Sequence, residues 1–151
     1  MGFRPRRVIV AVDAAADPDA DGDVGAALVD AACDVVGGVD DAVIRLVCVD
    51  GSRVVGVDPN ALALEADSDA AVAERLELLA ARVQQRGPRV EVALLSPVDG
   101  VGEAIAHDAA TADADLVVCW SHGRRGLSRV FLGSVAARIA HVATTPVLIL
   151  R

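Results

Sequence analysis

Short apolar runs recur along this chain of 151 residues, and they are separated by longer segments whose apolar residues have helical spacing. The runs are rich in Val, Ile and Leu and are apolar nearly throughout, which is typical of strands buried on both faces of a parallel sheet. We expect the strands at Val8–Val12, Ala42–Val49, Val90–Leu95, Asp115–Cys119 and Pro146–Leu150.

Four of the segments around these runs predict helices. Ser68 or Asp69 supplies a cap for the second helix, since both residue types accept a hydrogen bond from a first-turn N–H. In the last helix we expect Val135, Ile139 and Val142 to face the core. The expected helices lie at residues 24–36, from 68 or 69 to about 85, at 97–109 and from 133 onward.

This alternation of strand and helix predicts a three-layer α/β/α fold with an open parallel sheet and helices on both of its faces. The length, with no linker and no internal repeat, fits a single domain over residues 1–151. In such folds ligands bind beyond the carboxyl ends of the strands, where the strand order reverses. Asp13, Asp50 and residues 121–123 follow strands directly and are therefore the first candidates for a site.

The charge of the chain excludes some classes of function. The formal net charge is −8, and the aromatic residues are one Trp, two Phe and no Tyr. This argues against a general nucleic-acid or membrane-surface binder, and against stacking on single strands. All fourteen cations are Arg, and seventeen of the twenty-two acids are Asp. Such a composition resembles that of proteins from salt-loving archaea. A GC-rich genome is the alternative explanation.

The cysteines and histidines indicate neither a disulfide nor a metal site. The cysteines are isolated in apolar stretches, so we expect buried thiols in a reducing compartment, and the histidines are scattered. No apolar run is long enough for a signal peptide or a membrane span, and we expect a cytoplasmic protein. The residues concerned are Cys33, Cys48, Cys119, His107, His122 and His141.

One region reverses the acidic character of the chain. From Leu116 to Arg151 there are five Arg and no Asp or Glu. Within this region Ser121-His122-Gly123 is followed by nine residues and then by Gly133-Ser134, which opens a predicted helix. Backbone N–H groups at glycine turns and the positive end of a helix dipole bind anions. The residues themselves therefore predict a site for a nucleotide phosphate.

The segment DLVVCWSHGRRGLSRVFLGSV, which begins at Asp115, resembles the nucleotide loop of the universal stress protein family, and the ending TPVLILR also resembles that family. The family pattern is Gly-x2-Gly-x9-Gly-Ser/Thr. Gly123, the nine-residue spacer and Gly133-Ser134 match it, whereas Trp120 stands at the first glycine. The resemblance implies a five-stranded parallel sheet of the adenine-nucleotide α-hydrolase-like kind, commonly a homodimer, with a branch of the family that binds ATP.

Carried over by position, the resemblance implies a phosphate site at Gly123, Gly133, Ser134 and Val135. The glycines would let backbone N–H groups meet the phosphates. Ser134 would donate its hydroxyl and its N–H, and the Val135 N–H would add to the helix N-terminus. Mg²⁺ would accompany ATP through its phosphates. The alternative is that the glycines only form a turn and a helix entry, with Ser134 as a plain cap.

For the rest of the nucleotide, the resemblance implies Asp13 on the ribose or adenine side. It implies backbone near Val49, within one residue, as the group that reads adenine. Ala11 and Cys119 would line the base pocket. The alternatives are that Asp13 is a solvated or helix-capping acid and that Cys119 is a core residue only.

Two positions depart from the family pattern. Trp120 brings a large ring to a place where the family has no side chain, and Ala14-Ala15 replaces the usual serine after Asp13. The ring can block the ribose–phosphate path, swing outward, stack on a base, or pack against the core. Each of these possibilities stays open on the sequence alone.

Three functions are therefore considered. The first is an ATP-binding stress or regulatory protein, with slow ATP hydrolysis at most, that forms a homodimer through the apolar edge strand Pro146–Leu150. The second is a dimeric interaction module of the same fold that binds no nucleotide, which Trp120 favours. The third is an enzyme of the wider fold, although no nucleophile or base partner is evident beside His122. A loop covering the last strand is the alternative to the dimer.

Overall fold

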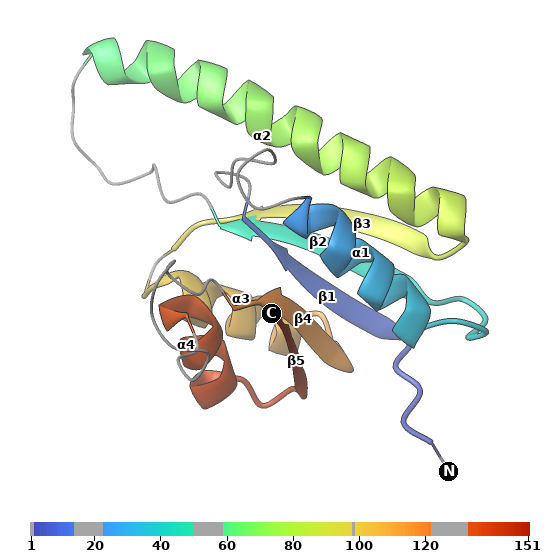
Figure 1. Ribbon diagram of the computed structural model, residues 1–151. Coiled ribbons are helices and arrows are strands. Elements are labelled where there is room, and N and C mark those ends of the chain that lie inside the picture. Colours follow the sequence, from blue (N-terminus) through green and yellow to red (C-terminus); the bar gives the residue numbers. More distant parts are fainter. Residues whose placement is uncertain (1, 14–22, 50–58, 98, 122–132) are drawn as a thin grey trace.

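The computed structural model describes residues 2–13, 23–49, 59–97, 99–121 and 133–151, and for residues 59–69 it describes the backbone alone. Strands and helices alternate along these residues (Figure 1). The strands are β1 (Arg7–Val12), β2 (Val43–Val49), β3 (Arg89–Leu95), β4 (Leu116–Trp120) and β5 (Val147–Leu150). The helices are α1 (Val24–Val35), α2 (Pro59–Arg86), α3 (Val101–Thr111) and α4 (Ser134–Val142).

The five strands form one parallel sheet in the order β3-β2-β1-β4-β5, which confirms the expected fold class. Val8 of β1 pairs with Ile44 on one side and with Leu116 on the other, so β1 lies at the centre. The chain runs outward from β1 to β3 and then returns to the far side of β1 as β4. The strand order therefore reverses between β1 and β4.

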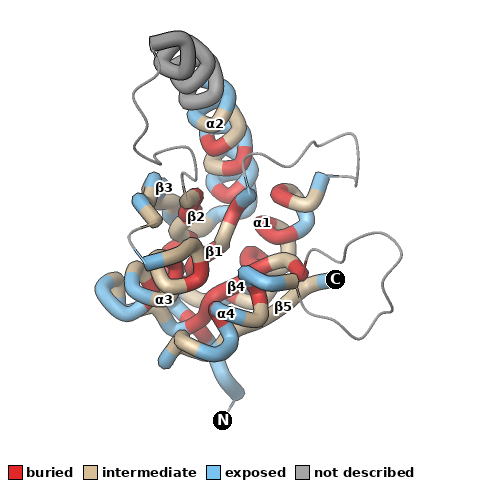
Figure 2. The backbone as a smooth tube through the Cα atoms, turned by 90° about the vertical axis from the view of Figure 1, so that its left-hand side faces the viewer, coloured by how far each residue is buried: buried red, intermediate tan, exposed pale blue. Residues whose placement is uncertain are grey.

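The two faces of the sheet carry separate apolar cores, because successive side chains of a strand point to opposite faces. Val8 and Val10 of β1 belong to the core under α1 and α2. Ile9 of β1 belongs to the core under α3 and α4, together with Ile105 and Ile139 of those helices. Figure 1 shows the two helix pairs on opposite sides of the sheet, and Figure 2 shows the buried residues on the strands and on the inner faces of the helices.

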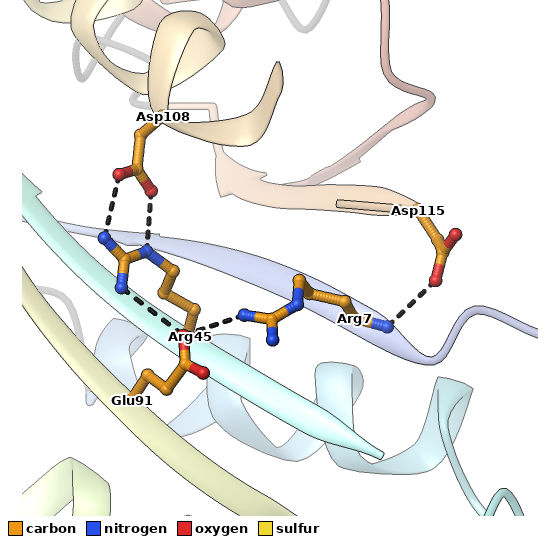
Figure 3. Close-up of polar contacts among 5 residues, drawn as sticks. All are labelled: Arg7, Arg45, Glu91, Asp108 and Asp115. Carbon is orange, nitrogen blue, oxygen red and sulfur yellow. Dashed lines mark hydrogen bonds and ion pairs between the residues drawn. The ribbon is translucent and has the colours of Figure 1, made fainter. Parts of the chain in front are cut away.

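A network of ion pairs ties three strands to α3 (Figure 3). Arg45 of β2 donates from Nε and Nη2 to the two carboxylate oxygens of Asp108 on α3, each at 2.9 Å. Nη1 of Arg7 on β1 donates to Oε2 of Glu91 on β3 at 2.8 Å, and Nη1 of Arg45 donates to the same oxygen at 3.4 Å. The Arg7 backbone N–H donates to Asp115 Oδ2 at 2.9 Å. The hydrogen bond with Asp108 raises the pKa of Arg45, so this guanidinium stays charged.

Two helix starts differ from the expected ones. Helix α2 begins at Pro59, before the expected cap at Ser68 or Asp69. Proline suits the first helical position, and the residues after it are mostly Ala and Leu, which are strong helix formers. Helix α3 begins at Val101 instead of Pro97, because Gly100 has φ of 127°, outside the helical range.

The predicted burial of one residue is also wrong. Val135 of α4 is 37% exposed, whereas Ala136 and Ile139 are buried and Val142 is half-buried. The buried pair has the three-residue spacing of one helix face, and Val135 lies beside that face.

Candidate functional site

The expected site lies where the carboxyl ends of β1 and β4 meet, at the reversal of strand order. β1 ends at Val12, and the exposed Asp13 follows it. β4 ends at Trp120, and Ser121 follows it. The structure thus brings Asp13, Trp120 and Ser121 to neighbouring strand ends, as the sequence predicts.

The three residues expected around the base share one face of the sheet. Cys119 of β4 is a buried member of the core under α3 and α4, and Ala11 of β1 and Val49 of β2 pack against that core. Ala11 and Val49 are half-buried, whereas Cys119 is 3% exposed. Burial raises the pKa of the Cys119 thiol to about 11, so this side chain is uncharged at physiological pH.

The Trp120 side chain belongs to the other face. It is half-buried and packs against the core under α1 and α2, as do Leu148 and Leu150 of β5. Trp120 pairs with Leu150 in the β4–β5 register. Of the alternatives for this ring, packing against the core is the one that the structure shows. The ring therefore lies across the sheet from Ala11 and Cys119.

Among the described residues, no side chain caps the N-terminus of α4. Gly133 is its N-cap residue, with φ of −58° and ψ of 153°. Its carbonyl accepts the first helical hydrogen bond, from the Ala137 N–H at 2.9 Å. The N–H groups of Ser134 and Val135 precede that bond and have no acceptor within the helix. Both residues are exposed at the positive end of the helix dipole, an arrangement suited to an anion.

Ser121 has a role that the sequence analysis missed. Its Oγ accepts a hydrogen bond from the Gly133 N–H at 3.1 Å, and its own N–H donates to the Leu150 carbonyl at 2.8 Å. It is 7% exposed and is the one buried polar residue in the described part of the chain. The available signal was a serine placed directly after a buried strand, at the start of the glycine segment. Nothing local indicates a partner twelve residues away.

The remaining residues of this region stand between Ser121 and Gly133 in the sequence. Gly123 and His122 lie outside the described residues, as do three of the five Arg of residues 116–151, Arg124, Arg125 and Arg129. Among the residues that the structure describes, no group of three or more His, Cys, Asp or Glu side chains is arranged to hold a metal ion. In the same part of the chain, no helix combines the length and apolar character needed to cross a membrane.

A groove of about 570 Å³ lies elsewhere, along α3 beside the end of β3. Its lining is mixed and contains none of the residues expected at the site. Two of its acids already have arginine partners, since Asp108 pairs with Arg45 and Glu103 pairs with Arg138. The lining residues are Leu95, Ser96, Asp99, Glu103, Ala104, His107, Asp108 and Thr111.

Comparison with known proteins identifies relatives of this fold and sequence. A family model described as the universal stress protein family matches residues 5–151. The universal stress protein Rv2005c of Mycobacterium tuberculosis is 36% identical over 89 residues, which cover 59% of this chain and 28% of that protein. The matched region is therefore little more than a quarter of the relative's length.

Solved structures share the fold at lower identity. The universal stress protein of Archaeoglobus fulgidus in complex with dAMP has a TM-score of 0.64 and 18% identity, with all of both chains covered. A universal stress protein family member of Arabidopsis thaliana with AMP bound has a TM-score of 0.65 and 21% identity, covering 97% of this chain and 91% of that one. At these identities the structural likeness shows the fold alone.

Proposed function

The chain belongs to the universal stress protein family, and from this premise we propose that it is a regulatory protein that binds an adenine nucleotide. One observation carries the proposal. The N-terminus of α4, where the N-cap residue Gly133 has no side chain to cap the first turn and Ser134 and Val135 are exposed residues, lies at the end of β4, where the strand order reverses. Two proteins of the same fold hold dAMP and AMP.

The proposed nucleotide has its phosphates at Gly123, Gly133, Ser134 and Val135. A phosphate there would receive N–H donors from the first turn of α4, where the helix dipole favours negative charge. Gly133 has no side chain, so the phosphate can approach the backbone closely.

The proposed base pocket uses Ala11, Val49 and Cys119, which lie on the α3 and α4 face of the sheet. Asp13 would contact the ribose or the adenine. Trp120 would support the floor of the site from the opposite face, where its ring packs. Trp120 stands at the first glycine position of the family loop, but with its ring on the opposite face it would not block the phosphates.

We further propose ATP with Mg²⁺ as the physiological ligand, with slow hydrolysis at most. In the geometry described above we identify no nucleophile paired with a base for faster chemistry. A homodimer through β5 completes the proposal. The Pro146 carbonyl accepts from Val117 of β4 and the Leu150 carbonyl accepts from Ser121, so by strand alternation the N–H groups of Val147 and Ile149 point to the outer side of this last strand.

Calorimetric titration with AMP, dAMP and ATP, with and without Mg²⁺, tests the nucleotide site. We expect saturable binding at about one site per chain, and at least tenfold weaker binding in Gly133→Val. The backbone angles of Gly133 suit any residue, so the fold should survive the substitution, while a branched side chain would obstruct the phosphate. Gly2→Val is the matched control, since a side chain there meets nothing within 4 Å.

The second candidate is a dimeric interaction module that binds no nucleotide. The observation in its favour is Trp120, which occupies the first glycine position of the family loop. A folded dimer that binds none of the three nucleotides would support this candidate and contradict the first. Binding that is equal in wild type and Gly133→Val would show that the nucleotide sits elsewhere.

A further inference from the structure

Ser121 joins three elements of the fold through two hydrogen bonds. It follows the last residue of β4, its N–H donates to the Leu150 carbonyl of β5 at 2.8 Å, and its Oγ accepts from the N–H of Gly133, the N-cap of α4, at 3.1 Å. The backbone bond holds the serine to the sheet. The side-chain bond then holds the start of the helix to the serine.

These two hydrogen bonds hold Gly133 next to Ser121, although the two residues are far apart in the sequence. Residues 122–132 separate Ser121 from Gly133, yet the two residues are in hydrogen-bond contact. Ser121 is more than nine-tenths buried, so water competes poorly for the Gly133 N–H. Replacing the serine by alanine would leave that N–H without this acceptor and would free the helix start to shift.

Building on the proposed nucleotide site, we propose that Ser121 is a positioning residue for phosphate. Its Oγ holds Gly133 at the end of β4, so that the next two N–H groups of α4, those of Ser134 and Val135, converge on the phosphate of a bound adenine nucleotide. The Ser121 Oγ bonds to the Gly133 N–H and not to the ligand, so Ser121 acts on the phosphate through the N-terminus of α4.

The contacts also predict which part of the ligand depends on Ser121. The base-side residues Ala11 and Val49 lie on β1 and β2, which this side chain does not hold. Loss of the hydroxyl should therefore reduce what the phosphate contributes to the binding affinity and leave unchanged what the nucleoside contributes. A role in general stability would weaken both together.

The test compares AMP with adenosine in wild type and Ser121→Ala. We expect the AMP preference, which is the ratio of the adenosine Kd to the AMP Kd, to fall at least fivefold, with the adenosine Kd within twofold of wild type. Ser121→Thr keeps a hydroxyl and should restore most of the preference. Ser96→Ala is the matched control, because Ser96 is exposed and follows β3, on the far side of the sheet.

A readout without ligand accompanies the binding data. In the free protein, Ser121→Ala should speed hydrogen exchange of the Gly133 amide and shift the amide resonances of Ser134 and Val135. These changes together with the loss of AMP preference support the role. An unchanged AMP preference in Ser121→Ala, or equal weakening of AMP and adenosine, overturns the inference and leaves the proposed function standing. A wild-type protein that binds neither ligand overturns both.

Discussion

At the level of single residues, the cysteines control how this protein responds to alkaline pH. The chain has no Tyr and no Lys, and its fourteen Arg stay protonated far above pH 11. Thiols are therefore the side chains that change charge between pH 9 and 11. Burial raises the pKa of Cys33, and it raises that of Cys119 to about 11 from the ordinary 9.0.

The raised pKa of Cys119 predicts a loss of stability above pH 9. The folded state holds the proton more tightly than the unfolded state, so the stabilisation is complete below pH 9 and is lost as the pH rises toward 11. A shift of this size corresponds to about 2 to 3 kcal/mol. Urea unfolding of wild type and Cys119→Ala at pH 8, 9, 10 and 11 measures it.

We expect the pH dependence to be shallower in Cys119→Ala, even though the variant is less stable at pH 8 through the lost packing. Cys33→Ala is the comparison variant, since it keeps the Cys119 thiol and should keep most of the slope. If the free energy of unfolding falls equally with pH in wild type and Cys119→Ala, the Cys119 thiol is not the cause of the loss.

Residue positions differ in how far the sequence determines them. Strand alternation places Trp120 opposite Cys119 from the sequence alone, but it does not tell which pair of helices covers each face. The contact between Ser121 and Gly133 spans twelve residues and depends on how α4 returns to the sheet. The core-facing side of α4 was misjudged at Val135 because its short apolar pattern fits more than one helix face.

At the level of elements, the close approach of α3 and α4 sets where the α4 N-terminus stands. A Cβ on Gly102 would lie 2.8 Å from Arg138 Cγ, 2.9 Å from Arg138 Cβ and 3.3 Å from the Ile139 N. Arg138 Cγ can move by rotation about χ1, but Arg138 Cβ and the Ile139 N cannot, so a contact below 3.0 Å remains in every rotamer. Gly102 therefore lets the two helices pack at their observed distance.

Gly102→Ala should destabilise the protein by about 1 to 2 kcal/mol. Overpacking of this kind typically costs about 1 to 3 kcal/mol, and the better helix propensity of Ala offsets at most about 1 kcal/mol. Chemical unfolding gives the free energy. The matched variant is Gly25→Ala, where the new Cβ meets the ends of the Leu79 and Arg75 side chains at 3.1 and 3.2 Å, which can move. A larger loss in Gly25→Ala than in Gly102→Ala would contradict this account.

The elements themselves were predictable to different degrees. The three inner strands β1, β2 and β4 are predictable because they are mostly buried on both faces and therefore apolar nearly throughout. The edge strands β3 and β5 are only partly buried, but they still carry short apolar runs. Helix starts were less certain, since Pro59 and Gly100 act through backbone geometry rather than through the apolar pattern. Ser68 and Asp69, which look like caps in the sequence, lie inside α2 because the residues before them also favour a helix.

At the level of the whole molecule, the net charge opposes the dimer that we propose through the edge strand β5. Each chain carries a formal charge of −8, so two copies repel as they approach. The proposed dimer joins β5 to its copy through outward N–H groups and half-buried apolar side chains. The Debye length falls from about 10 Å at 0.1 M salt to about 3 Å at 1 M, so added salt screens the repulsion and leaves the apolar contact.

We therefore expect the dimer dissociation constant to fall at least threefold between 0.1 and 1 M KCl, measured by sedimentation equilibrium. Ile149→Pro and Ile149→Ala form the matched pair, since both remove the side chain that packs under α3 and α4, but the proline alone removes the N–H that points away from β4. Pairing through β5 predicts a dimer for the alanine variant and a monomer for the proline variant. Equal dissociation in both variants would place the contact in side-chain packing, and association that weakens with salt would show that charge pairs hold the copies together.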